Sequence, residues 1–289
     1  ALIYGASGTT NLPAIGAQLP MLWPKWSFLV GVGLLTTAFA FKVAAVPFHM
    51  WAPDVYEGAP TTVTAFMSTG AKAAAFAAFV LVFLQTLKVS GTKVNEVIAI
   101  IAASSMVVGN VVAIAQSNIK RMLAYSSIAH AGYMLSGIAA GNSEGQTGIL
   151  FYVVAYTFMN IGAFGVVSLM ENEEDKNLQL EDYAGLSRQR PYLAALMAVF
   201  MFSLAGIPPF AGFFGKYYVF LSAVKANMTW LAIVGVLTSL VSAYYYLRIV
   251  IMMYFRDGDG NVGATPALTS VLAVTCSALL LLQFGLFPS

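Results

Sequence analysis

The chain has 289 residues, of which 59% are hydrophobic and 9% are charged, and its mean hydropathy is +0.79. These values lie outside the range of soluble globular domains and indicate an integral membrane protein. The formal net charge of +2 gives no indication of a nucleic-acid partner. The single cysteine, Cys276, lies in an apolar run with no other Cys or His nearby, which excludes a disulfide framework and a metal site built on it.

The chain begins with ALIYGASGTTNLP, which has neither a basic start nor a small-residue cleavage site. We expect this stretch to be the tail of an earlier membrane span and the chain to be a fragment. Windows of about 20 apolar residues, the length that a spanning helix needs, then predict eight spans near 26–48, 61–87, 97–117, 122–141, 147–170, 191–224, 228–254 and 266–287. The expected fold class is an all-α polytopic membrane protein that forms a single membrane domain over residues 1–289.

Short polar joints separate these windows and carry most of the charge. Alternate joints should lie on the same side, and those at 49–60, 116–121, 171–191 and 256–263 carry six basic residues against four on the other side. The positive-inside tendency therefore predicts that this set of joints is cytoplasmic. Only the joint at 171–191 is long enough to hold a surface helix of its own.

Three lysines, Lys42, Lys72 and Lys216, fall at membrane depth, whereas all twelve acidic residues lie in joints or at helix ends. A lysine at the centre of a bilayer helix costs roughly 2.5–3.5 kcal/mol on insertion scales. Three such residues therefore indicate a function, and a lysine held away from water can take up and release protons as a relay requires.

Polar side chains recur at helical spacing on three predicted helices. They are Thr61, Thr64, Ser68 and Lys72 on the first, Ser126, His130 and Tyr133 on the second, and Tyr152, Tyr156 and Asn160 on the third. Such stripes could line a hydrated track through the bundle, although Ser, Thr and Asn also join membrane helices without any further role. The full set of proton-relay candidates is Lys42, Lys72, Lys216, His130, Ser68, Tyr125, Tyr133 and Tyr156.

Two of the predicted helices contain prolines close to these lysines. Pro47 follows Lys42 in FKVAAVPFHMW, and Pro208 and Pro209 precede Lys216 in GIPPFAGFFGK. Proline frees backbone carbonyls, which a membrane interior tolerates only beside protein or water. Paired interruptions of this kind are typical of inverted-repeat transporters, although an ordinary proline kink is the simpler alternative.

Histidines and acids near the membrane surface are weaker candidates. His130 is expected to be the only histidine at membrane depth, because His49 falls at a helix end. A single intramembrane histidine can serve a relay or can simply bond a neighbouring serine. Asp54 and Glu57 in WAPDVYEGAP could assist proton uptake or could belong to a solvated turn.

Three motifs resemble a known family. PFHMWAPDVYEGAPTTVTAFMSTGAKAAAF, NIKRMLAYSSIAHAGYML and LAGIPPFAGFFGKYYVF are similar to the subunit N family of the bacterial NADH:quinone oxidoreductase, respiratory complex I. That family belongs to the antiporter-like proton-channel subunits, which also include the large subunits of multisubunit sodium/proton antiporters. The lysine at position 216 and the lack of a histidine in STGAKAAAF favour this family over the related subunits M and L.

The resemblance implies fourteen helices in two inverted five-helix repeats, with this chain beginning at the end of the sixth. Lys42 would correspond to the lysine of the broken seventh helix, Lys72 to that of the eighth and Lys216 to that of the broken twelfth. It also implies a glutamate, on a fifth helix that precedes this chain, that pairs with the lysine at the position of Lys42.

The function that the resemblance implies is proton translocation in a multi-pass subunit of the bacterial inner membrane, as part of a translocase whose redox chemistry lies elsewhere. FMN, iron–sulfur clusters and quinone would be held by partner subunits, no cofactor or metal by this chain, and neighbouring antiporter-like subunits would be its closest partners. Two alternatives remain: a subunit of a sodium/proton antiporter, and a structural bundle in which methionine could replace the lysines.

Overall fold

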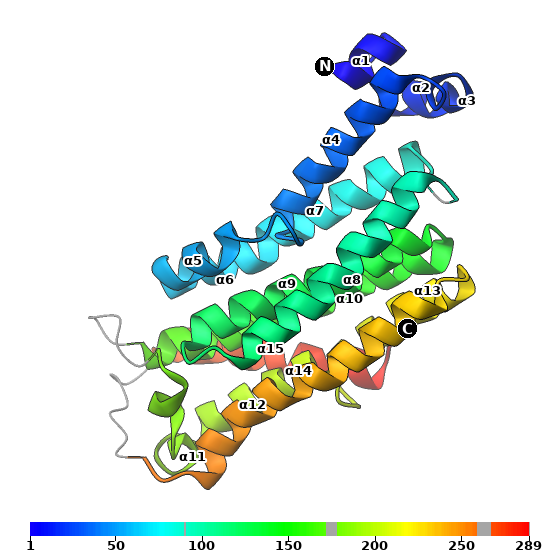
Figure 1. The fold of residues 1–289 in the computed structure, drawn as a ribbon. Helices are drawn as coiled ribbons and strands as arrows, with labels where there is room; N and C mark the ends of the chain where they lie inside the picture. Colours follow the sequence, from blue (N-terminus) through cyan, green and yellow to red (C-terminus); the bar gives the residue numbers. More distant parts are fainter. Residues whose placement is uncertain (90, 172–177, 259–266, 289) are drawn as a thin grey trace.

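The computed structural model describes residues 1–289 except 90, 172–177, 259–266 and 289. Within these ranges the chain forms helices and connecting segments, with one isolated β-bridge between Asn118 and Gln179 (Figure 1). In chain order the helical elements are α1 (Leu2–Ser7), α2 (Leu12–Ala17), α3 (Leu19–Leu22), α4 (Trp26–Lys42), α5 (Trp51–Gly58), α6 (Thr61–Phe66), η1 (Met67–Ala71), α7 (Lys72–Phe79), η2 (Val80–Thr86), α8 (Lys93–Ile114), α9 (Ile119–Ala140), α10 (Ser143–Met170), η3 (Leu180–Tyr183), α11 (Leu186–Gln189), α12 (Pro191–Ala205), α13 (Ala211–Lys225), α14 (Thr229–Phe255) and α15 (Leu268–Leu286).

Five helical segments of the described chain are long and apolar enough to cross a membrane: Thr61–Thr86, Lys93–Ile114, Ser143–Met170, Thr229–Phe255 and Leu268–Leu286. The other three predicted windows correspond to α9 and to two broken helices, α4 with α5 and α12 with α13. The prediction of about eight spanning helices, two of them discontinuous, is confirmed. The chain is a multi-pass membrane protein.

The segment from Thr61 to Thr86 is not a uniform α-helix. η1 and η2 are π-helical, and they flank the eight α-helical residues of α7. Wide turns of this kind are rare and occur often at functional sites. Lys72 is the first residue after η1, so the interruption lies directly beside the lysine that stands at the middle of this span.

Helix α9 forms the centre of the bundle, between α8, α10 and α13. Every residue of α9 except Arg121 is buried, as expected for a helix that contacts neighbours on all sides. Gly132 permits the close approach of α8, because a Cβ atom at this position would lie only 2.7 Å from the carbonyl oxygen of Ala102. Polar residues on α9 therefore lie inside the protein and not against lipid.

Residues 49–60, predicted as a joint, are mostly helical in the structure. Residues Trp51–Gly58 are helical, and α5 continues from the break after α4 towards one end of the bundle (Figure 1). Pro53 does not prevent this helix because proline is tolerated in a first helical turn, where its missing N–H would have no partner. The connection to α6 is therefore confined to Ala59 and Pro60.

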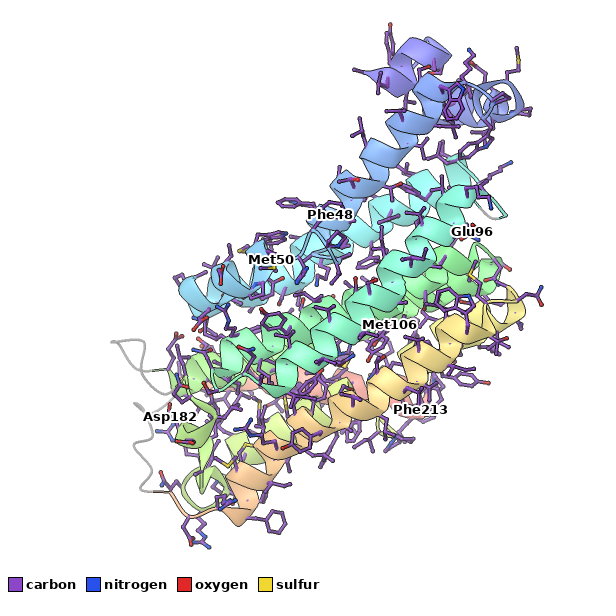
Figure 2. The ribbon with its side chains drawn as sticks, in the orientation of Figure 1. Phe48, Met50, Glu96, Met106, Asp182 and Phe213 are labelled. Carbon is purple, nitrogen blue, oxygen red and sulfur yellow. The ribbon has the colours of Figure 1, made fainter. Side chains whose placement is uncertain are left out.

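The alternate joints lie at one end of the bundle, as predicted. The N–H of Ile119 donates to the carbonyl of Leu178, and the N–H of Gly185 donates to the carbonyl of Met252. We call this end, which includes Arg121 and the segment 178–190, the basic end; it lies at the left in Figure 1. Figure 2 shows Asp182 at this end and Glu96 at the opposite end.

Candidate functional site

Lys72 is held by two neutral oxygen atoms of α9. Its side chain is only 3% exposed, and its Nζ donates to the carbonyl oxygen of Ser127 over 2.8 Å and to the Oγ of the same residue over 2.5 Å. The Nζ also lies 5.8 Å from the centre of the Tyr156 ring, within the range of a cation–π contact. These contacts satisfy an ammonium group without a carboxylate.

Lys216 uses the break between α12 and α13. Its Nζ donates to the carbonyl oxygens of Leu204 and Ala205 over 3.0 and 2.9 Å, and to the Oγ of Ser239 over 2.8 Å. Both carbonyls are free because α12 ends at Ala205, and the negative end of its dipole favours a cation there. The Nζ lies 5.1 Å from the centre of the Tyr133 ring.

His130 is surrounded by tyrosines at the centre of the bundle. Its Nδ1 is 2.8 Å from the hydroxyl of Tyr152 and its Nε2 is 3.1 Å from the hydroxyl of Tyr246. The imidazole ring is also 5.5 Å from the ring of Tyr133 and 5.2 Å from that of Tyr156, measured between centroids. Because the side chain is 1% exposed, both ring nitrogens depend on these protein partners.

The two lysines are therefore connected through His130. Tyr156 contacts both Lys72 and His130, and Tyr133 contacts both His130 and Lys216. A histidine that bonds hydroxyl groups on both sides can accept a proton on one nitrogen and release one from the other. This arrangement can carry protons between two basic groups, with water completing the steps that side chains do not bridge.

Three of the predicted relay residues lie outside this cluster. Lys42 is the last residue of α4 and is exposed, with no hydrogen bond or ion pair to the described residues. Ser68 is fully buried, but its Oγ donates to the carbonyl of Ala65 on its own helix. Tyr125 is 9% exposed and lies on α9 near Gly109.

The prolines lie at the two breaks that they predicted. Pro47 lies in the connection between α4 and α5, and Pro208 and Pro209 lie in the connection between α12 and α13. His49 also lies in the first break, two residues before the start of α5, and is 9% exposed.

Several contacts of the cluster were not predicted from the sequence. Ser239 and Tyr246 come from α14, and Tyr246 also bonds Ser126. Their spacing of seven residues is helical, so the same search for polar stripes could have found them. Ser127 could not have been found in this way. The helical spacing relates Ser126 to His130 and gives no reason to choose Ser127 as the partner of Lys72.

The part of the chain that the structure describes contains no group of three His, Cys, Asp or Glu side chains that could hold a metal ion. The ionisable groups of the cluster are instead two amines, one imidazole and several phenols.

Comparison with known proteins places the chain in a family. The family model for NADH:quinone oxidoreductase/Mrp antiporter transmembrane subunits matches residues 1–242. NADH-quinone oxidoreductase subunit N 1 of Chloroherpeton thalassium is 51% identical over 292 residues, which cover 100% of this chain and 61% of that protein. Subunit N of Trichlorobacter lovleyi is 50% identical over 296 residues, covering 100% and 60%. The chain thus spans about three fifths of the length of these curated relatives.

Similarity to solved structures supports the same family. A chain of respiratory complex I from Thermus thermophilus with bound Aureothin is similar with a TM-score of 0.85 and 39% identity, over 99% of this chain and 62% of that one. A chain of the Mrp complex from Dietzia sp. DQ12-45-1b gives a TM-score of 0.89 at 21% identity, over 99% and 61%, which is a likeness of fold alone. The chain therefore belongs to the family of transmembrane NADH:quinone oxidoreductase/Mrp antiporter subunits.

Proposed function

We propose that residues 1–289 form a single membrane domain that translocates protons as part of a subunit N of NADH:quinone oxidoreductase in a bacterial plasma membrane. The observation that carries this proposal is the connection of two buried lysines through His130 and its tyrosines. The identity of about half of all residues to proteins named subunit N supports the choice of complex.

In this proposal the chain moves protons and holds no redox centre. FMN, iron–sulfur clusters and quinone belong to partner subunits, and neighbouring antiporter-like subunits lie beside it in the membrane. Electron transfer in those partners alters the charge around Lys42, whose exposed ammonium is free to pair with a carboxylate outside the described residues. A change at Lys42 then alters the balance of charge that Lys72 experiences.

Protons then pass from Lys72 to Lys216. The ammonium of Lys72 releases a proton into the hydroxyl and imidazole groups around His130, and the neutral amine of Lys216 takes one up at the other side. Because like charges repel more strongly in a medium of low dielectric constant, a proton on one lysine disfavours a second proton on the next. This repulsion favours states in which one of the two lysines carries a proton and the other is neutral.

Lys72→Met in the full-length protein tests the proposal. Methionine fills a similar volume but cannot carry a proton, so NADH:quinone turnover and proton pumping in membrane vesicles should both collapse while the complex still assembles. Lys93→Met is the matched control, because the Lys93 side chain is 91% exposed and its ion pair among the described residues is with Glu96 at a helix start. If Lys72→Met assembles and retains both activities, the proposal is wrong.

A sodium/proton antiporter subunit is the second candidate function. The likeness of fold to a chain of the Mrp complex from Dietzia favours it, although the sequence identity of 21% is much lower than to the proteins named subunit N. In that case proton movement would depend on sodium and would need no NADH. Vesicles tested with and without a sodium gradient distinguish the two functions.

A further inference from the structure

A fourth lysine is buried, at the basic end of the bundle. Lys120 is the second residue of α9 and is only 2% exposed. Its Nζ donates to the carbonyl oxygen of Ala59 over 2.7 Å and lies 3.6 Å from the Oε1 of Glu171, whose side chain is 13% exposed. The distance to Glu171 is longer than a hydrogen bond, so the two groups attract each other as charges without sharing a proton directly.

The Oε1 of Glu171 has no hydrogen-bond partner among the described residues, although it is buried. The phenol of Tyr183, which is also buried and unpartnered, lies close enough to interact with it electrostatically. Burial raises the pKa of Tyr183, and the charges of Asp182 and Glu171 raise it further. Glu171 therefore has a buried cation and a neutral phenol as neighbours, and its Oε1 is left without a hydrogen bond to the described residues.

Glu171 directly follows α10 as its C-cap and continues a row of unpartnered polar groups on that helix. The hydroxyl of Tyr156 and the Oδ1 of Asn160 form this row among the described residues. Glu171 follows them by fifteen and eleven residues, which are close to whole numbers of turns, so the three side chains lie on one side of α10, over about 22 Å. The buried and unpartnered Thr61 comes from α6, which packs against α10.

Polar atoms buried without a protein partner usually bind ordered water. The row on α10 begins at the basic end with Glu171 and ends at Tyr156, the ring that lies over the Nζ of Lys72. These unpartnered atoms are therefore candidate water sites between one end of the bundle and the first buried lysine of the relay.

We propose that Glu171, positioned by Lys120, is the carboxylate that takes up protons at the basic end and passes them along the Asn160 and Tyr156 side of α10 to Lys72. The carboxylate gains a proton from water at this end and later loses it to the path, and the neutral amine of Lys72 gains one, so that only O–H and N–H bonds change. This inference rests on the proposed function.

Among the described residues, Asp54 and Glu57 are two further carboxylates near the start of α9, and they are bound differently. A single nitrogen of Arg121, Nη1, donates to Asp54 over 2.9 Å and to Glu57 over 2.6 Å. Both of these carboxylates are therefore held by an arginine. Glu171 has no such bonds to the described residues and is more deeply buried, so its Oε1 is left open to a buried water molecule.

Glu171→Gln in the full-length protein, within the complete complex, is the first test. Glutamine keeps the shape of the side chain but cannot carry a proton, so pumping and NADH:quinone turnover should fall at least about tenfold with assembly intact. Glu144→Gln is the matched control, because Glu144 lies at the start of α10, at the opposite end of the bundle. Its side chain is 44% exposed and forms an ion pair with Lys225. Its rates should stay within about twofold, since exposed pairs contribute little.

A double variant separates proton uptake from a structural role. Replacing a buried ion pair by apolar or neutral groups is often harmless to stability, whereas removing one partner is not. If the pair only fastens the helices, Glu171→Gln combined with Lys120→Met should recover the full rate, and that recovery would overturn the inference. If Glu171 takes up protons, the double variant stays slow. Glu171→Asp, which retains a carboxylate, is then faster than both Glu171→Gln and the double variant.

Comparison with Lys72→Met shows which proposal has failed. A normal rate in Glu171→Gln together with a collapse in Lys72→Met would refute only the role of Glu171. Normal rates in both would refute the proposed function as well.

Discussion

Gly206 controls the position of the Lys216 ammonium. It ends α12 with φ 86° and ψ 39°, a left-handed conformation that costs residues with a side chain roughly 1–2 kcal/mol. A Cβ atom here would also lie 3.0 Å from Cδ and 3.2 Å from Nζ of Lys216, where ordinary contacts begin near 3.4 Å. Gly206→Ala therefore requires Lys216 to move by a few tenths of an ångström.

Such a movement lengthens the hydrogen bonds from Lys216 to the carbonyls of Leu204 and Ala205, which now measure 3.0 and 2.9 Å. A hydrogen bond to a charged group contributes about 1.5–3 kcal/mol, so losing one lowers the population of correctly placed ammonium at least about tenfold. We expect proton pumping in Gly206→Ala to slow by this factor.

The assay compares initial pumping rates in vesicles that contain equal amounts of assembled complex. Gly33→Ala is the control, because no heavy atom lies within 4 Å of a Cβ at Gly33 and its φ is ordinary. Alanine within α4 should leave the rate unchanged. If Gly206→Ala assembles normally and pumps at the full rate, the carbonyls that hold Lys216 do not determine its function, and the reasoning is refuted.

Two further predictions concern the centre of the bundle. Tyr246→Phe keeps the ring but removes the hydroxyl that bonds Ser126 and the Nε2 of His130, so we expect pumping to fall by about 100-fold without loss of assembly, and an unchanged rate would exclude Tyr246 from the relay. Gly212→Ala would place a Cβ 1.9 Å from the carbonyl oxygen of Ser203, and this backbone atom cannot move aside. The amount of assembled complex measured after extraction should therefore fall sharply. Normal assembly would contradict the packing of α12 on α13.

The fold could be predicted where local chemistry decides it. The spans follow from runs of apolar residues, and the two breaks follow from Pro47, Pro208 and Pro209, because proline interrupts a helix whatever surrounds it. The burial of Lys72 and Lys216 also follows from the runs that contain them. The second half of the first broken helix was missed because the prolines around α5 resemble those of a loop.

Contacts between distant parts of the chain could not be predicted. Lys120 lies within the polar joint predicted at 116–121, and its burial depends on Ala59 and Glu171, which are 61 and 51 residues away. The choice of Ser127 as the partner of Lys72 likewise depends on how α7 is rotated against α9. Such pairings are set by packing of whole helices, on which the spacing within one helix carries no information.

The rotation of α7 against α9 also depends on the π-helical segments η1 and η2 that lie on either side of it. A π-turn holds one residue more than an α-turn. If the wide turn of η1 passed along the helix beyond Lys72, this lysine would turn by about 100° around the axis while both ends of the span stayed where they are. Lys72 would then leave Ser127 and face a different neighbour. A shift of a wide turn along this span would therefore reorient one side chain while the helices keep their positions.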